Sequence, residues 1–272
     1  TLTFQIGLPA TKYQSIDSMV AAHQSVIDRV DALPGVAAVS ATTCLPLSMG
    51  CNGNTLIVEG DVLPAGTLPP LSLFRAVGGG YFEAMGMRIL RGRGLDRGDV
   101  DRKEPVAVIS QWLAEHAFKD RDPIGRRIAS NQPPDRNGKR TLEWVTVVGV
   151  VSNTPTRALN ESEPMPMRFM PMSLANGIDT TRPIPSGAFM NFVVRTTNPP
   201  LSVVSPVRDA VRSVGGDLAM ANVRTLQAIV DRASAQMTFT MVLLAIAASV
   251  ALILGVMGIY GATSYIVSQR AR

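Results

Sequence analysis

The side chains that most often carry out catalysis are scarce in this chain, which has two histidines and two cysteines among 272 residues. His23 falls within a predicted amphipathic helix and His116 within a short helical stretch, positions that are typical of structural histidines. Neither belongs to an HExxH motif, and the cysteines form no CxxC, so the sequence indicates no zinc site. No GxSxG motif marks a serine nucleophile. We therefore expect a protein that is not an enzyme and holds no metal.

Phosphate-binding glycine motifs are also missing from the sequence. Gly138-Lys139-Arg140 lacks the Ser or Thr of a GxxxxGK[ST] loop, and Pro133 occupies the place of its first glycine. Gly78-Gly79-Gly80 lacks the GxGxxG spacing and is predicted to be a turn before Tyr81. We expect no nucleotide or other cofactor to bind to this chain.

One segment is rich in basic side chains: Arg88, Arg91, Arg93, Arg97, Arg102 and Lys103. Such a run can form a patch for phosphates or lipid headgroups. Asp96, Asp99 and Asp101 interrupt it, which favours a solvated hairpin of mixed charge. The net charge of the chain is +5, too small to indicate a nucleic-acid partner.

Methionines gather between Met165 and Met172, in a stretch from Asn160 to Pro185 that is predicted to be irregular. Thioethers can bind a soft metal ion such as Cu(I). More often such residues fill gaps in a core or form an adaptable apolar surface. The second role is the one we favour.

Cys44 and Cys51 lie in a loop-like stretch, with six residues between them. In an oxidising compartment they can form a small-loop disulfide, and otherwise they are two free thiols. The spacing alone does not choose between these alternatives.

A membrane segment is the strongest local signal in the chain. Charged residues make up 17% of the sequence, below the roughly 25% of average proteins. No charge occurs between Ala233 and Gln269, and the 20 residues from Met241 to Tyr260 are long enough to span about 30 Å of hydrocarbon. Tyr260 and Tyr265 sit near one end, where aromatic rings favour the headgroup zone. We expect residues 233–272 to contain one transmembrane helix.

Small residues recur along this helix, at Ala247, Ala251, Gly255, Gly258 and Ala262. Rows of small side chains let two helices approach closely in lipid, so the row is a candidate helix-packing surface. The alternative is that glycine and alanine are simply common in membrane helices.

The orientation of the span is not settled by charge. Arg224 and Arg232 precede it, and Arg270 and Arg272 follow it, so the positive-inside rule gives a tie. The chain opens on a predicted strand without an initiator Met or a basic leader, and we expect it to be excised from a longer polypeptide.

The part before the membrane segment predicts an α+β domain. Apolar residues at helical spacing between Ser15 and Leu33 lie between two predicted strands, Leu2–Leu8 and Val36–Thr42. A second strand–helix–strand unit is predicted at Phe189–Thr196, Leu201–Val214 and Ala219–Val223. Thr225 is placed to cap the helix that leads into the membrane.

The region between these two units is predicted to be rich in strands. Candidate strands are Thr55–Glu59, Leu71–Val77, Met87–Arg91, Pro105–Ser110, Arg126–Ala129 and Leu142–Val151, with short helices at Tyr81–Met85 and Gln111–Phe118. Gln132–Gly138 is predicted to be a loop. Two end units around an insertion suggest two subdomains, whose strand order cannot be derived from the pattern.

Several motifs carry a family resemblance, and they follow one another as Gly80–Arg93 (GYFEAMGMRILRGR), Pro105–Ile109 (PVAVI), Asp122–Ile128 (DPIGRRI) and Val147–Val151 (VVGVV). In this order they resemble the MacB-like periplasmic core domain of ABC-transporter permeases. Val223–Leu226 and the segment from Leu244 to Arg270, with Gly258-Ile-Tyr-Gly261, resemble the entry into an FtsX-like permease domain, in the form common in acidobacterial permeases.

The resemblance implies a domain outside the bacterial cytoplasmic membrane, with residues 1 to about 232 on the periplasmic side and the chain re-entering the cytoplasm near Arg270. It implies a porter-like half from residues 1–76 and 188–232, an inserted sabre-like half from 77–187, and the start of the permease domain in 233–272. The implied partners are a cytoplasmic ABC ATPase subunit, a second permease copy or pseudo-symmetric half, an envelope adaptor or channel, and membrane lipid.

The expected function is a permease subunit whose outer domain couples ATP hydrolysis by a partner to export or to activation of an envelope partner. One alternative is an envelope-remodelling permease that moves a hydrolase or lipoprotein and transports no solute. A membrane-anchored enzyme is the other alternative, and the residue inventory argues against it. Export predicts a channel or adaptor at the distal tip, whereas remodelling predicts a bound hydrolase or lipoprotein.

Overall fold

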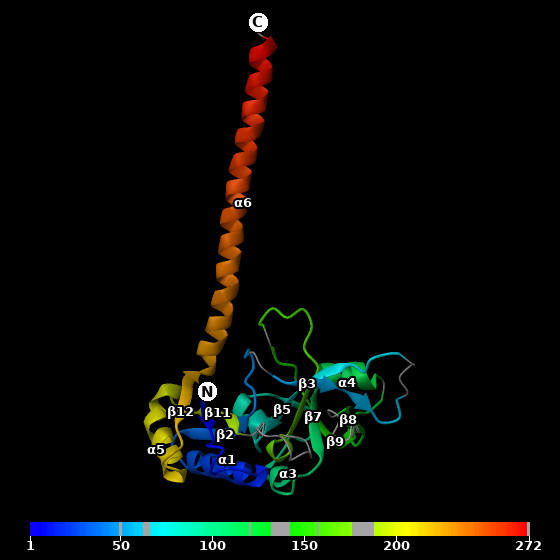
Figure 1. Cartoon of the computed structure of the whole chain (residues 1–272), viewed down its shortest axis with the longest axis vertical. Coiled ribbons are helices and arrows are strands. Elements are labelled where there is room, and N and C mark those ends of the chain that lie inside the picture. Colours follow the sequence, from blue (N-terminus) through cyan, green and yellow to red (C-terminus); the bar gives the residue numbers. More distant parts are fainter. Residues whose placement is uncertain are drawn as a thin grey trace. The chain divides into compact units, whose positions relative to one another are not determined.

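The computed structural model of the chain describes residues 1–48, 51–61, 66–119, 121–131, 142–156, 158–175 and 188–270. Of residues 130, 131, 236–240 and 260–270 it describes the backbone only. The chain divides into two compact units, Thr1–Ala228 and Ile229–Arg272 (Figure 1). The first is an α+β domain built on one twisted sheet, and the second is a single helix.

Four strands from the two ends of the first unit form one part of the sheet, in the order β12-β1-β11-β2. Their bounds are β1 Leu2–Gly7, β2 Val36–Thr42, β11 Phe189–Thr196 and β12 Met220–Thr225. Neighbours in this order pair antiparallel, so β1 and β2 run parallel with β11 between them. Each predicted strand–helix–strand unit is therefore split by a strand of the other unit. We call these strands and their helices the terminal part.

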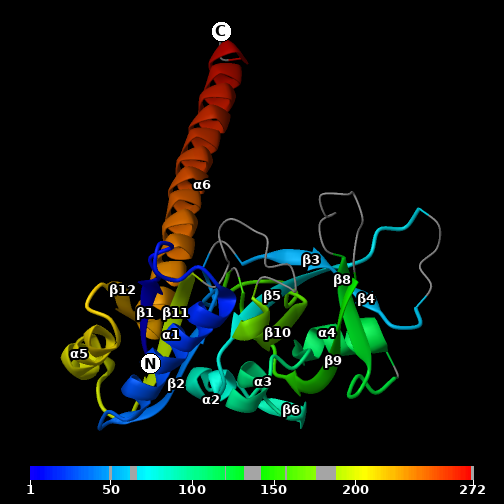
Figure 2. The ribbon, with the colours of Figure 1, turned by 60° about the horizontal axis from the view of Figure 1, so that its bottom comes forward.

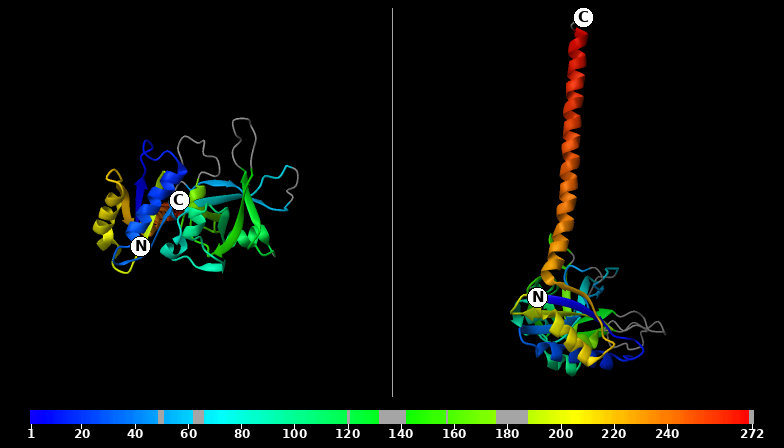
Figure 3. Two further views of the ribbon diagram at one scale, coloured as in Figure 1. Left: turned by 90° about the horizontal axis from the view of Figure 1, so that it is seen from below. Right: turned by 90° about the vertical axis from the view of Figure 1, so that its left-hand side faces the viewer.

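Two helices, α1 (Ile16–Asp31) and α5 (Val204–Val214), cover one face of the terminal part (Figures 2 and 3). Ser15 caps α1 in a capping box with Ser18, which is where the apolar periodicity predicts the helix to begin. The core beneath the helices is apolar, and the rings of Phe4 and Phe192 stack in it at 5.0 Å between centroids. The 3-10 turn η2 (Pro200–Val203) precedes α5, so the predicted helix Leu201–Val214 is a 3-10 turn followed by an α-helix.

The middle part continues the same sheet in the order β5-β10-β7-β9-β8-β4. The bounds are β5 Leu71–Val77, β10 Met167–Pro171, β7 Val106–Ser110, β9 Leu142–Val151, β8 Arg127–Asn131 and β4 Ile57–Val58, with β3 Gly53–Thr55 on β5 and β6 Ile89–Gly92 on β9. Thr42 of β2 pairs with Val77 of β5, which joins the two parts. The helix α4 (Gln111–Phe118) packs on a second apolar cluster.

Part of the stretch predicted to be irregular is a central strand. β10 pairs parallel with β5 and antiparallel with β7, and the 3-10 turn η1 (Met172–Leu174) follows it. Local propensity does not predict a strand in a segment that ends in Pro171. The strand forms because partner strands on both sides hydrogen-bond to its backbone. Met167 and Met172 are buried, so these two residues fill the core.

The basic run is not a hairpin, because it passes from β6 into a short helix, α3 (Arg97–Asp101). Asp96 caps this helix through the backbone N–H of Asp99. The glycine turn before α2 (Tyr81–Met85) allows a close crossing here: a Cβ on Gly79 would lie 2.6 Å from the backbone nitrogen of Arg97.

Two further predictions remain to be compared with the structure. The expected strand Thr55–Glu59 is divided between β3 and β4, and the predicted loop Gln132–Gly138 lies outside the described residues. The division into porter-like and sabre-like halves stays a prediction, because Thr1–Ala228 forms one compact unit.

Candidate functional site: the apolar helix and the junction within the sheet

The helix α6 (Leu226–Arg270) follows β12 without an intervening loop. The hydroxyl of Thr225 accepts a hydrogen bond from the backbone N–H of Ala228 at 3.1 Å, as the sequence predicts for a cap. The backbone N–H of Leu226 donates to the carbonyl of Thr1 at 3.0 Å. The start of the helix is thus tied to the first residue of β1.

The segment Met241–Ile259 of α6 is long and apolar enough to cross a bilayer. Its 19 residues have a mean hydropathy of 2.7, and none of them is buried in the structure. A soluble protein would bury a helix that is apolar on every face, so lipid is the environment that suits this one.

The predicted helix-packing row lies on the same segment. Added Cβ atoms at Gly255 and Gly258 would meet no atom within 4 Å in this chain, and Ala247 and Ala251 are exposed. Ala262 lies where the structure describes the backbone only. The row is open to a neighbouring helix, and its role in packing stays a prediction.

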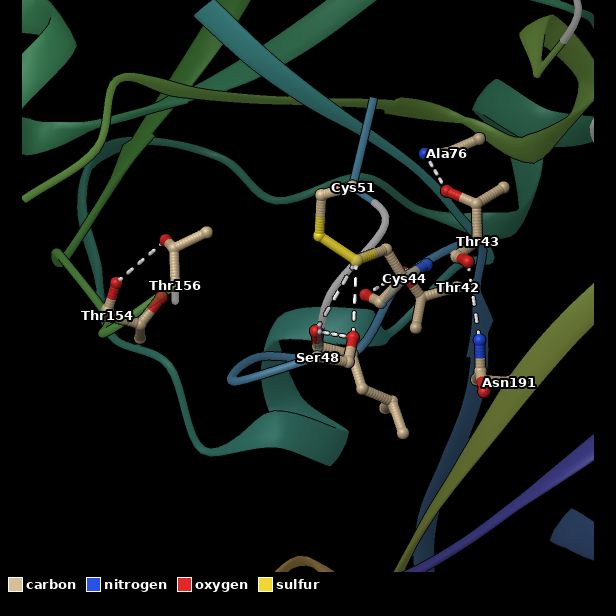
Figure 4. The surroundings of a disulfide bond; sticks show 10 residues. Thr42, Thr43, Cys44, Ser48, Cys51, Ala76, Thr154, Thr156 and Asn191 are labelled. Atoms are coloured by element: carbon tan, nitrogen blue, oxygen red, sulfur yellow. Dashed lines mark hydrogen bonds between the residues drawn. A yellow bond between two sulfur atoms is a disulfide. The ribbon is translucent and has the colours of Figure 1, made fainter. Parts of the chain in front are cut away.

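Cys44 and Cys51 form a disulfide with a Cα–Cα distance of 5.5 Å (Figure 4). It lies in the connection between β2 and β3, where the chain leaves the terminal part and enters the middle part. Hydrogen bonds tie this connection to both parts: Ala76 of β5 donates to the Thr43 hydroxyl at 3.1 Å, and Asn191 of β11 donates to the Thr43 carbonyl at 3.3 Å. Disulfides persist in extracytoplasmic compartments, so this bond suits a domain outside the cytoplasm.

Two ion pairs also connect the parts. Arg97 of α3 contacts Asp28 of α1 at 2.6 Å, and Lys103 contacts Asp17 at 2.6 Å. These side chains are about half exposed, and such pairs typically contribute less than about 1 kcal/mol. They can therefore break and re-form at little cost if the parts move.

One acid of the basic run is buried and pairs with one of its bases. Arg93 donates two hydrogen bonds to the buried carboxylate of Asp99, at 2.6 and 2.8 Å, and the backbone N–H of Asp96 donates a third. Burial opposes the charged form of Asp99, but these hydrogen bonds outweigh it and lower the pKa of that carboxyl. A carboxylate that is held ionised within the run does not favour a phosphate patch there.

Two buried arginines are features that the sequence reasoning missed. Arg75 of β5 is fully buried and Arg168 of β10 is 2% exposed. In the parallel register each lies opposite the phenylalanine of the other strand, Arg75 beside Phe169 and Arg168 beside Phe74. All three guanidinium nitrogens of Arg75 lack a hydrogen-bond partner among the described residues. Burial lowers the pKa of Arg168 to about 10, partly opposed by Glu143.

The signal that could have revealed these arginines is visible in the sequence. Both occur inside apolar runs, Leu71–Val77 and Met165–Met172, where a solvated strand would alternate polar and apolar residues. In the parallel register of β5 and β10, the dipeptides Phe74-Arg75 and Arg168-Phe169 lie side by side, so that each arginine faces a phenylalanine.

The histidines lie on different elements. His23 is buried on α1 against the ring of Phe192, and His116 is on α4, where its ring stacks on Trp112 at 3.8 Å. Nδ1 of His116 hydrogen-bonds to the Trp112 carbonyl. Within the described ranges no group of three or more His, Cys, Asp or Glu could hold a metal ion.

One family model, described as the MacB-like periplasmic core domain, matches residues 5–214. Among curated proteins, the macrolide export ATP-binding/permease protein MacB of Neisseria gonorrhoeae is 32% identical over 103 residues, which are 38% of this chain and 13% of that protein. The protein of the same name from Neisseria meningitidis serogroup B matches with the same values. The matched region is thus a small part of these relatives.

Two solved structures are similar to this chain. The periplasmic region of MacB from Actinobacillus actinomycetemcomitans covers 81% of this chain and 88% of its own, with 16% identity and a TM-score of 0.49. The extracellular domain of the noncanonic ABC-type transporter YknZ from Gram-positive bacteria covers 83% and 100%, with 14% identity and a TM-score of 0.50. The second likeness shows a shared α+β fold.

Proposed function

Because this chain belongs to the family of MacB-like periplasmic core domains, we propose that it transmits the work of a cytoplasmic ATPase to the outside of the membrane. The family places it in an ABC transporter permease, with the domain on the extracytoplasmic side of a membrane. In this proposal residues 1 to about 232 stand outside the bacterial cytoplasmic membrane, and the moving span acts on them to drive export.

The observation that carries the proposal is the continuity of α6. Its 45 residues extend for about 67 Å, whereas the hydrocarbon core of a bilayer measures about 30 Å. The 15 residues from Leu226 to Thr240 therefore stay helical before the candidate span begins. A helix without a flexible linker passes on displacement and torque, which a disordered connection would absorb.

The ATPase belongs to another chain or another segment in this proposal, because this sequence has no phosphate-binding loop. The chain itself acts without catalysis. A second permease copy, or a pseudo-symmetric half, would meet the row Ala247, Ala251, Gly255, Gly258 and Ala262 within lipid. Cross-linking of cysteines introduced at Ala251 of two copies would detect that contact, and its absence from membranes would argue against the row.

The proposal has two versions, which differ in the molecule that the outer domain moves. In the first it expels a solute, together with an envelope adaptor or channel. In the second it moves an envelope hydrolase or lipoprotein. The curated relatives are named for macrolide export, which favours the first version.

The experiment interrupts α6 outside the span. Arg232 is exposed, and Arg232→Pro removes a helix hydrogen bond and kinks the helix at a cost of about 3 kcal/mol, while Arg232→Ala keeps it intact. The full-length permease with its ATPase is reconstituted in liposomes, and hydrogen exchange of the outer domain is compared with and without ATP.

The wild type and Arg232→Ala should show an ATP-dependent change in exchange across the outer domain. Arg232→Pro should hydrolyse ATP and lose that change. The ATPase rate should vanish when the partner ATPase is left out. Mechanical transmission through α6 would be overturned if hydrogen exchange of the outer domain did not depend on ATP in the wild type, or depended on it equally in Arg232→Pro.

A further inference from the structure

The two cysteines of the disulfide lie in different surroundings. Cys44 is 6% exposed, whereas Cys51 is half-buried and is followed by two exposed residues, Asn52 and Gly53. A disulfide is cleaved when a thiolate attacks one of its sulfur atoms, and access is one factor that decides which sulfur reacts. A thiolate that comes from solvent therefore approaches Cys51 more easily than Cys44.

The sulfur of Cys44 is also the better leaving group. The hydroxyl oxygen of Ser48 lies 3.5 Å from Sγ of Cys44 and donates to the Leu45 carbonyl at 2.6 Å (Figure 4). Because the hydroxyl can turn from that carbonyl to the sulfur, it can stabilise a negative charge that develops on Sγ of Cys44. Among the described residues, no polar group hydrogen-bonds to Sγ of Cys51. A leaving thiolate that is stabilised in this way departs faster.

Backbone hydrogen bonds hold the chain on both sides of the disulfide. The N–H of Thr43 donates to the Ala76 carbonyl at 3.0 Å, and the N–H of Phe74 donates to the Asn52 carbonyl at 2.9 Å. Ala76 and Phe74 both belong to β5, so the residues that flank the two cysteines are fixed to the same strand. Cleavage of the disulfide therefore leaves these attachments in place and does not require the domain to unfold.

The segment between the cysteines has less to hold it. The N–H of Leu47 donates to the Thr156 carbonyl at 2.9 Å, and Leu47 has a φ of 56°. This left-handed conformation is unfavourable for leucine and persists only where the surroundings impose it. Once the disulfide is open, Leu47 can relax and leave Thr156. Cleavage thus frees the loop at the point where the chain passes from the terminal part to the middle part.

We propose that Cys51 is a modification site for a small thiol. The thiolate attacks Sγ of Cys51, forms a mixed disulfide with it and breaks the Cys44–Cys51 bond, and Sγ of Cys44 leaves as a thiolate that takes a proton from water. A second small thiolate then attacks the mixed disulfide and releases Cys51. Two thiols are oxidised to one disulfide, and the two cysteines gain two electrons and two protons.

The thiol has to come from another molecule, because the chain has only these two cysteines. The inference is independent of the transport proposal, since the exchange needs neither an ATPase nor a membrane potential. Its failure would leave mechanical transmission through α6 untouched, and the reverse also holds.

The site of attack is tested with glutathione, added to the full chain in detergent and quenched with acid after short times. Free thiols are then alkylated, and peptides are analysed by mass spectrometry. We expect glutathione on Cys51 and the alkyl group on Cys44, about tenfold or more in excess of the reverse pattern. Equal labelling of the two cysteines, preference for Cys44, or no adduct on the folded chain would overturn the proposal.

Variants of Ser48 test the leaving group. Ser48→Ala should slow the attack on Cys51 about tenfold, because a hydrogen bond to a charged sulfur is lost, whereas Ser48→Thr keeps the hydroxyl and should react nearly as fast as the wild type. Ser202→Ala is the matched control, because the Ser202 hydroxyl donates to the Pro199 carbonyl at 2.8 Å just as that of Ser48 donates to a carbonyl. An unchanged or higher rate in Ser48→Ala would refute the assignment of Cys44 as the stabilised leaving sulfur.

A core variant shows whether the folded domain reacts. Ile6 is fully buried in the terminal part, and Ile6→Val should raise the unfolded population about two- to tenfold while the domain stays folded. If glutathione reaches Cys51 in the folded state, the rate of attack should not change. A rate that rises in proportion to the unfolded population would show that attack requires unfolding, and it would overturn the proposal.

Discussion

The terminal and middle parts share one sheet, but only the middle part buries side chains of Arg and Asp among the described residues. In the terminal part, the helices α1 and α5 cover a core of apolar side chains such as Phe4, Val26 and Phe192. In the middle part, Arg75, Arg168 and Asp99 are buried. The strands of both parts follow the sequence pattern closely, for example β5 and β9 in the middle part, but the pattern predicted neither β10 nor the buried arginines.

This difference suggests different roles for the two parts. An apolar core stabilises through buried area, with about 25 cal/mol per Å² removed from water. Buried charges contribute little stability and are often destabilising unless they are well paired. The middle part has its own, smaller apolar cluster, so we expect the terminal part to contribute the larger share of the domain's stability, together with the disulfide that joins the two parts.

The largest effect is expected from truncation of the stacked rings in the terminal core. Phe4→Ala leaves a cavity beside Phe192 and should lower the free energy of unfolding by about 3–5 kcal/mol. Unfolding in denaturant is followed by far-ultraviolet circular dichroism and by fluorescence. Both tryptophans, Trp112 and Trp144, lie in the middle part, so their fluorescence reports on that part alone.

If the two parts unfold as one cooperative unit, both signals shift equally in Phe4→Ala. A shift in circular dichroism without a shift in fluorescence would show that the middle part is stable by itself. A loss below about 1 kcal/mol would contradict the claim that the apolar core dominates.

A smaller effect is expected from the disulfide. The double variant Cys44→Ala, Cys51→Ala opens a loop of eight residues, for which the chain-entropy relation gives a loss of about 2–3 kcal/mol. Thermal unfolding of the full chain with and without reductant provides the control. The wild type should fall to the stability of the double variant when reduced, and the variant should not respond. If complete reduction left the thermal stability of the wild type unchanged, the junction would be held by its hydrogen bonds alone.

The smallest effect, and one of opposite sign, is expected for a buried arginine. Arg75→Met replaces a guanidinium that has no hydrogen-bond partner among the described residues with an apolar chain of similar length, which can keep the contact with Phe169, so stability should stay equal or rise by about 1 kcal/mol. Arg88→Met, at an exposed position, is the matched control and should change stability by less than about 0.5 kcal/mol. A loss above about 2 kcal/mol in Arg75→Met alone would reveal a compensating acid and remove the contrast between the two parts.

Features that depend on a local pattern could be predicted from the sequence. The 3.6-residue periodicity between Ser15 and Leu33 predicts α1, and the uncharged stretch after Ala233 predicts the span. The ordered motifs from Gly80 to Val151 identified the family that the family model confirms. Each of these signals is carried by neighbouring residues or by their order along the chain.

Tertiary structure decided what depends on residues distant in sequence. β10 exists because β5 and β7 hydrogen-bond to it on either side, and their paired residues lie about 95 and 60 positions earlier in the chain. The split of each strand–helix–strand unit and the cation–π contact of Arg75 with Phe169 likewise join segments distant in sequence. Cys44 and Cys51 are close in sequence, but their spacing left the choice between a disulfide and free thiols open, and the folded loop decides it. The free energy of such contacts is gained only once the chain has closed the loops between them, so it leaves no periodic trace in the sequence.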